Sequence, residues 1–537
     1  MEQTNSNDDV LKLLGIFAAV AIIYKIAMTV YQWGLGFLNK NPVIFYSSVT
    51  LFLGFLVGLI FIKLRKKYFL RKEEGAITNG TAEDSVFAGF DEINKKVFVN
   101  LSFRRMHTQV VGTTNAGKTE SVIMPWIIDD IEKDRGLVFI DGKSDLQLLN
   151  KIYSYVVKSG REKDFKLISL SQVDKSDSYN PVIGTVVQVT EKIINSFQIE
   201  NEYYRTVQFD ILRNILEIFK EAGETPNFLK VRQVIANPAD LQKLMTKVRN
   251  LQLTEWAVEF INTNKEKRRE LVSGLVSNLG FFTASEFSSM FNTSNPTINI
   301  TEAMNSHQIV FFQLPVLQSP ILGKSVAKMV LQDIQNAVST RHASSKPDHP
   351  FFSVYLDDFT EYLTPQFVSL LNKSRSANIG VVFAHQAIGD LEVLGPEIKN
   401  QILTNSNLKV FMRTNEPDSA EYFSKIVGTK QSHKVTFRQK EGFISNNVTG
   451  DGSIRDVEEF VYHPNIFKSE LGLGEAVMIL PHKKGTKTVK LKFSIRPNLP
   501  KVEIPNKPKY EPEALLASVL ANNSAMESLA SSAAGRG

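Results

Sequence analysis

From about residue 85 onward, short apolar runs alternate with stretches in which apolar residues recur at helical spacing. The runs cover residues 108–111, 137–140, 167–170, 309–312, 351–356, 379–383, 408–412 and 476–480. Most of them are apolar at every position, which is typical of strands that are covered on both faces. Such strands, alternating with helices, indicate an α/β fold with a largely parallel sheet.

The pattern changes between residues 186 and 300, where apolar residues follow helical spacing. Asn237 followed by Pro238 is typical of a helix start, because Asn caps free N–H groups and Pro fits the first helical position. We therefore expect an all-helical domain inserted between the two parts of the α/β domain, 75–185 and 301–500. The last thirty residues, from Pro508, are rich in Ala, Ser and Asn, and we expect residues 501–537 to form a flexible tail.

Two long apolar stretches precede this pattern, at residues 11–38 and 43–62. The second carries no charged residue and is long enough to cross a hydrocarbon core of about 30 Å. An acidic leading segment without a small-residue cleavage site argues against a cleavable signal peptide. Residues 1–74 are therefore predicted to form a membrane anchor with two transmembrane helices. An amphipathic helix lying on the bilayer remains the alternative for residues 11–38.

The net charge of +6 is concentrated in residues 63–74, where six Lys and Arg residues against two Glu residues contribute +4. A basic cluster next to an apolar span stays in the cytoplasm, which places both termini on that side. The rest of the chain is nearly neutral, so its charge does not argue for nucleic-acid binding. The absence of Cys excludes disulfides, zinc ribbons, iron–sulfur clusters and a cysteine nucleophile.

The strongest motif is GTTNAGKT, a match to G-x-x-x-x-G-K-[ST] between an apolar run and a helical pattern. Its backbone N–H groups are expected to bind phosphates at a helix N-terminus. Lys118 would contact the β- and γ-phosphates of ATP, and the Thr119 hydroxyl would ligate Mg²⁺. Asn115 stands where many such loops have Gly, and Asn tolerates a left-handed backbone. The predicted nucleotide-binding residues are Gly112, Thr113, Thr114, Asn115, Ala116, Gly117, Lys118, Thr119 and Glu120.

Two carboxylates, Asp357 and Asp358, follow the apolar run 351–356. We expect Asp357 to hold Mg²⁺ through water and Asp358 to orient the water that attacks the γ-phosphate. Gln386 ends the next run and could sense the γ-phosphate or position that water. If Asp358 does not orient the water, Glu361 or Gln386 is the alternative. Arg375 is the candidate arginine finger for a neighbouring subunit, with Arg413 as its alternative.

In their order and spacing, these motifs resemble the coupling-protein ATPases of type IV secretion and conjugation, the TraG/TraD-type family related to FtsK and HerA motors. The resemblance also includes the predicted membrane hairpin. It further includes the segment LVFIDGKSD, with Asp141, Lys143 and Asp145, and the sequence Tyr179-Asn180-Pro181. Three features depart from the family pattern, namely Asn115 for Gly, Asp358 for Glu, and a very short segment between the two apolar stretches.

The resemblance implies a RecA-like P-loop domain and an ATP-hydrolysing, Mg²⁺-dependent homo-hexamer in the bacterial inner membrane. Its implied partners are relaxase-bound single-stranded DNA, secreted effector proteins, other inner-membrane type IV secretion components and membrane lipid. Two other functions remain possible, an FtsK/HerA-like translocase of double-stranded DNA and a nucleotide-gated scaffold that moves no cargo. The first usually carries a C-terminal winged helix, for which residues 495–537 are too short.

Overall fold

The computed structural model describes Lys25, Thr29 and residues 83–514 except 285, 346–347, 441–446 and 483–484. Apart from Lys25 and Thr29, the predicted transmembrane segments 11–38 and 43–62 lie outside these residues. Among the residues that are described, no helix has the length and apolar character needed to cross a membrane. The chain divides into two compact units, 1–79 and 80–537, and every helix and strand with described bounds belongs to the second.

An eleven-stranded sheet forms the centre of the second unit, in the order β2-β1-β13-β12-β9-β3-β8-β7-β4-β6-β5. The seven strands from β9 to β5 are parallel to one another, and the other four pair antiparallel. The prediction of an α/β fold with a mostly parallel sheet is therefore confirmed. The strands are β1 (Ser85–Asp91), β2 (Lys96–Asn100), β3 (Thr108–Val111), β4 (Gly136–Asp141), β5 (Phe165–Ser169), β6 (Ile309–Gln313), β7 (Phe352–Asp357), β8 (Ile379–His385), β9 (Leu408–Phe411), β12 (Glu475–His482) and β13 (Gly485–Phe493).

Helices cover both faces of the sheet, as the uniformly apolar strands require. One face packs against α4 (Met124–Glu132) and α5 (Leu146–Lys158). The other packs against α14 (Pro320–Ala343), α15 (Phe367–Ser374) and α16 (Pro396–Asn405). The remaining short elements are α3 (Leu101–Arg104), α17 (Pro417–Val427), η1 (Lys118–Ile123), η2 (Val173–Lys175), η3 (Phe359–Tyr362), η4 (Ile388–Leu394) and η5 (Ile466–Glu470).

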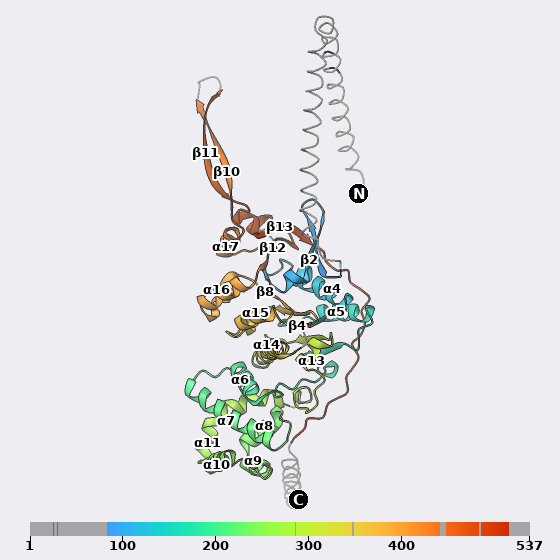
Figure 1. Ribbon diagram of the computed structural model, residues 1–537, viewed down its shortest axis with the longest axis vertical. Helices are drawn as coiled ribbons and strands as arrows, with labels where there is room; N and C mark the ends of the chain where they lie inside the picture. The colour runs from blue at the N-terminus through green and yellow to red at the C-terminus, as the bar shows by residue number, and fades with distance from the viewer. Residues whose placement is uncertain are drawn as a thin grey trace, which may run out of the picture. The chain divides into compact units, whose positions relative to one another are not determined.

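Between β5 and β6, every regular element is a helix (Figure 1). The Asn237 side chain accepts a hydrogen bond from the Ala239 N–H at 3.1 Å, so it caps α9 as its sequence position indicates. The helical segment is not a separate body, because α6 packs against α14 and both belong to one apolar core. Its helices are α6 (Val186–Ser196), α7 (Glu202–Glu221), α8 (Phe228–Ala236), α9 (Pro238–Met245), α10 (Leu251–Asn262), α11 (Lys265–Thr283), α12 (Ser288–Phe291) and α13 (Ile300–Asn305).

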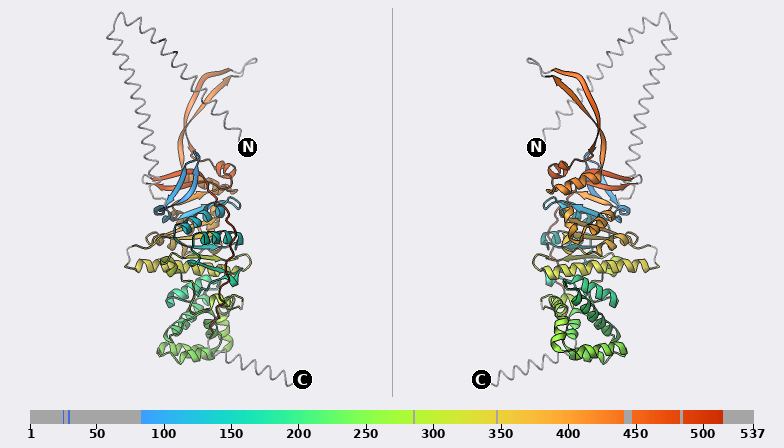
Figure 2. Two further views of the ribbon diagram at one scale, coloured as in Figure 1. Left: turned by 90° about the vertical axis from the view of Figure 1, so that its right-hand side faces the viewer. Right: turned by 90° about the vertical axis from the view of Figure 1, so that its left-hand side faces the viewer.

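A two-stranded antiparallel hairpin, β10 (Thr429–Lys440) with β11 (Asn447–Phe460), follows α17 and was not anticipated from the sequence. It leaves the large sheet on the side away from the helical segment (Figures 1 and 2). The strands carry charged residues at Lys430, Lys434, Arg455 and Glu459, and they have no uniformly apolar run. A search for buried strands therefore overlooks them.

The prediction of a flexible tail from residue 501 is wrong as far as residue 514. Residues 494–514, here called the strap, run extended from the end of β13 to the helical segment (Figure 1). The strap's Pro497 carbonyl accepts a hydrogen bond from Tyr155 Oη at 2.8 Å, and Lys507 pairs with Asp177 at 3.1 Å. Five prolines favour this extended backbone without internal hydrogen bonds. The Ala- and Ser-rich composition that suggested flexibility belongs mostly to later residues.

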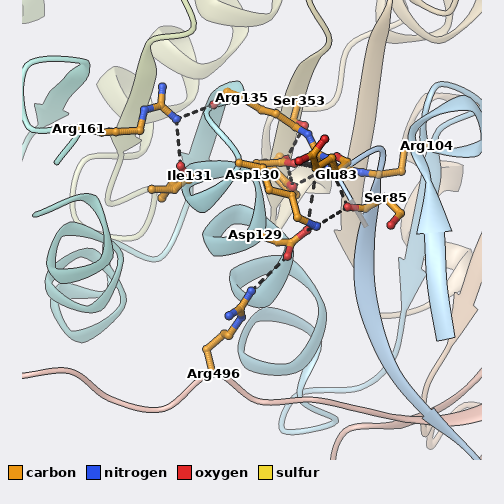
Figure 3. A network of polar contacts seen from close by, with 12 residues as sticks. Glu83, Ser85, Arg104, Asp129, Asp130, Ile131, Arg135, Arg161, Ser353 and Arg496 are labelled. Atoms are coloured by element: carbon orange, nitrogen blue, oxygen red, sulfur yellow. Dashed lines mark hydrogen bonds and ion pairs between the residues drawn. The ribbon is translucent and has the colours of Figure 1, made fainter. Parts of the chain in front are cut away.

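A buried ionic cluster joins the two elements that flank β3 to the strand β7 (Figure 3). Arg104, at the end of α3, donates to both carboxylate oxygens of Asp130 on α4, at 2.7 and 2.9 Å. Its guanidinium also donates to Ser353 Oγ at 3.0 Å and to Tyr355 Oη at 2.6 Å, both on β7. Burial alone would raise the pKa of Asp130. The charge and hydrogen bonds of Arg104, with the charge of Arg135, lower it to about 2.

Replacing Asp130 with Asn should strongly destabilise the fold, because it leaves the charge of Arg104 buried without a counter-charge. We expect a loss of about 3–5 kcal/mol, seen as a lower midpoint of thermal unfolding. The ionised carboxylate stabilises the wild type above its ordinary pKa of 3.8. This stabilisation should be lost as the pH falls toward about 2, and the variant should not lose it. Asp134→Asn removes a carboxylate that is 75% exposed and serves as the control. Equal losses in the two variants would contradict the prediction.

Candidate functional site

Residues 112–117 form a loop from β3 to a π-helical turn, η1, which begins at Lys118 and continues into α4. Asn115 (φ 63°) and Gly117 (φ 96°) both have left-handed backbones, so Asn115 adopts the conformation that makes Asn an acceptable replacement for Gly. A Cβ atom on Gly117 would lie 2.8 Å from Ser121 Oγ, so the close turn requires Gly at this position. The loop therefore has the strand, turn and helix N-terminus that phosphate binding requires.

The two chemically active side chains of the loop are held by nearby oxygen atoms. The buried Lys118 ammonium donates to the carbonyls of Gly112 at 2.7 Å and Thr113 at 3.3 Å. Burial lowers the pKa of Lys118, and the carboxylate of Asp357 opposes that shift. Thr119 Oγ1 donates to Asp357 Oδ2 at 2.7 Å, which joins residues 238 positions apart. The two predicted Mg²⁺ ligands thus lie side by side, and a hydroxyl and a carboxylate are oxygen ligands suited to that ion.

A second buried acid lies beside Asp357. Asp141 ends β4 and stands opposite Asp357 in the parallel register of β4 and β7. Burial raises the pKa of Asp141 to about 7, although it accepts hydrogen bonds from the N–H groups of Lys143 and Asp145 at 2.9 Å each. Burial also raises the pKa of Asp357, and the charge of Lys143 opposes this shift. The carboxyl ends of the parallel strands therefore gather two buried acids next to the phosphate-binding loop, and burial disfavours the ionised form of each.

Asp358 has an unusual backbone and a clear partner. Its φ of 45° and ψ of 42° lie in the left-handed region, which is uncommon for a residue other than Gly. Its carboxylate Oδ2 is 2.8 Å from Lys143 Nζ. Lys143 stands out in the sequence only as part of the segment LVFIDGKSD, which resembles the coupling-protein family. One indication of its role was present in the sequence: Lys143 lies two residues after Asp141, which ends β4, the strand next to β7.

The other predicted polar residues do not all gather at the loop. Gln386 lies against it, since its Oε1 accepts a hydrogen bond from Thr114 Oγ1 at 3.3 Å. Glu120 is exposed and pairs with Lys151 on α5 at 3.2 Å. Glu361 is paired with Lys324 on α14 at 2.9 Å. Gln386 is thus the alternative water-orienting residue that the structure brings to the loop.

The two candidate arginines lie at opposite edges of the sheet. Arg375 is exposed at the C-terminal end of α15, just before the start of β8. Because β8 runs parallel to β3, that end lies away from the loop by the length of the strand, about 23 Å. Arg413 follows β9, and its carbonyl accepts a hydrogen bond from the Thr113 N–H at 2.9 Å. Only Arg413 is therefore adjacent to the loop of its own chain.

Residues 352–459, from β7 into β11, match the family model described as the TraM recognition site of TraD and TraG. A curated relative, the type 4 coupling protein DotL of Legionella pneumophila, is 22% identical over 411 residues. The matching region covers 64% of this chain and 52% of DotL, so the chain spans about half the length of this relative.

The fold is similar to that of solved coupling proteins. The unbound form of the bacterial conjugative coupling protein TrwBdeltaN70 has a TM-score of 0.56 and 13% identity, over 76% of this chain and 90% of that one. The plasmid coupling protein TrwB in complex with ADP and Mg²⁺ has a TM-score of 0.55 and 14% identity, over 75% and 89%. At sequence identities of 13% and 14%, this similarity shows a shared fold. With the family model and DotL, it confirms the resemblance predicted from the sequence: this chain is similar to the type IV coupling proteins.

Proposed function

We propose that the chain is a membrane-anchored coupling protein that hydrolyses ATP. In this proposal it recruits relaxase-bound DNA, effector proteins or both, and drives them into a type IV secretion or conjugation channel. The hydrogen bond between Thr119 and Asp357 carries the ATPase part of the proposal. It joins the phosphate-binding loop to the strand-end carboxylate in the arrangement that Mg²⁺-assisted phosphoryl transfer needs. The similarity to DotL and TrwB supports the coupling role.

When bound, Mg²⁺ would neutralise charge on the β- and γ-phosphates. Thr119 and Asp357 would hold the ion, and Lys118 would add a positive charge to the same phosphates. Asp358 and Gln386 are the groups available to orient the attacking water. The position of Arg375 supports a homo-hexamer with ATP at the subunit boundaries, because this arginine is exposed and lies at the end of β8 away from its own loop.

Lys118→Ala should reduce ATP turnover by at least about a hundredfold. The substitution removes the ammonium that would stabilise the negative charge developing on the phosphates in the transition state. ATPase rates would be measured on the full-length chain in detergent, with and without single-stranded DNA, alongside complementation of export. Lys158→Ala, on the exposed side of α5, is the matched control. Normal export by Lys118→Ala would contradict a motor function.

The same assay separates the alternative functions. A coupling motor that moves single-stranded DNA should be stimulated by single-stranded DNA, whereas an FtsK/HerA-like translocase should respond to the duplex. A nucleotide-gated scaffold should respond to neither.

Arg375→Ala should lose most of its turnover and keep ATP binding, since an arginine finger contributes roughly a thousandfold or more. Mixing it with Lys118→Ala subunits should restore part of the activity. Some boundaries in mixed rings would pair an intact loop with an intact arginine. Turnover would be followed across mixing ratios, with mixed oligomers verified by differential tags. If no ratio restores activity, Arg375 does not act in trans, and Arg413 becomes the residue to replace.

A further inference from the structure

Lys143 lies in the connection between β4 and α5, at the same edge of the sheet as the phosphate-binding loop. Its ammonium is 2.8 Å from the carboxylate of Asp358, and its side chain is 49% exposed. A surface ion pair of this exposure would ordinarily contribute little. Lys143 differs from an ordinary surface lysine because its ammonium also interacts electrostatically with the buried carboxylates of Asp141 and Asp357.

The charge of Lys143 is firmly maintained. Burial would lower the pKa of its ammonium, but the charges of Asp357 and Asp358 and the hydrogen bond to Asp358 raise it above the ordinary value. The cation is therefore present at any physiological pH.

Asp358 has two features that make a fixed partner useful. Its left-handed backbone is held in a sparsely populated region, and such strain persists only where the surroundings maintain it. Its side chain is one methylene shorter than the Glu of the family pattern, so its carboxylate has less reach. The ion pair restricts that short side chain to one orientation, whereas Asp357 has a separate partner in Thr119.

We propose that Lys143 is a positioning residue that holds the Asp358 carboxylate in place to orient the water that attacks ATP. This inference rests on the proposed ATPase function and adds a residue to it. Lys143 acts through Asp358, and the Mg²⁺ ligands Thr119 and Asp357 remain paired without it. Losing the lysine should therefore affect the chemical step and leave nucleotide binding nearly intact.

The test compares Lys143→Gln, Lys143→Arg and Asp358→Asn with the wild type, all as full-length protein. Lys143→Gln should lower kcat roughly tenfold to a hundredfold, the loss that follows when a reacting group is displaced by up to about 1 Å. KM and the affinity for Mg²⁺·ATP should stay within about twofold, because an interaction used only in the transition state affects kcat. Lys143→Arg keeps the charge and should retain most of the rate.

A double-mutant cycle separates positioning from an independent effect. Adding Lys143→Gln to Asp358→Asn should lower kcat no further, because the carboxylate that the lysine holds is already gone. Lys158→Gln, at the other end of α5, is the matched control and should change nothing. Unfolding midpoints of the Lys143 variants should match that of the wild type, since Lys143 is a half-exposed loop residue.

An unchanged kcat in Lys143→Gln, or an effect that multiplies with that of Asp358→Asn, would overturn the proposal. So would a large rise in KM at constant kcat, which would make Lys143 a phosphate-binding residue. A wild-type chain without ATPase activity under any condition would instead refute the proposed function itself. If the wild type hydrolyses ATP and only the Lys143 variants lose activity, the proposed ATPase function remains supported.

Discussion

The buried ion pair between Arg104 and Asp130 controls how the site is built. Arg104 lies before β3, Asp130 lies on the helix that follows the phosphate-binding loop, and both contact Ser353 and Tyr355 of β7. A charge taken out of water is tolerated only when its partners are all in place. The cluster therefore holds the elements on either side of the loop against β7, the strand that ends in Asp357.

Parallel strand order supplies the second requirement, because the carboxyl ends of parallel strands meet at one edge. Asp141, Asp357 and the loop after β3 consequently come together from distant parts of the chain. The same geometry places Arg375 at the opposite edge. Arg413, by contrast, follows β9 and lies next to the loop, where its carbonyl accepts a hydrogen bond from the Thr113 N–H.

The strap gives the helical segment a second attachment to the nucleotide-site half of the chain. It contacts α4 through Arg496 and Asp129, and it reaches α8 through Glu513 and Lys230. Because α4 continues directly from η1, the strap connects an element next to the phosphates to the inserted helices. Composition could not reveal this role, since an extended segment gains its stability from contacts with distant residues rather than from its own periodicity.

The sequence by itself determined the eight strands β3 to β9 and β12, the parallel character of the sheet, the phosphate-binding loop and the strand-end acids. These features depend on local patterns, namely apolar runs, a glycine-containing motif and adjacent carboxylates. Tertiary structure alone decided the pairing of Lys143 with Asp358, the pairing of Glu361 with Lys324, the order of the strap and the end of the strands at which each arginine lies. The physical reason is that ion pairs and exposed edges depend on which strands become neighbours, and one chain's local pattern carries no record of that order.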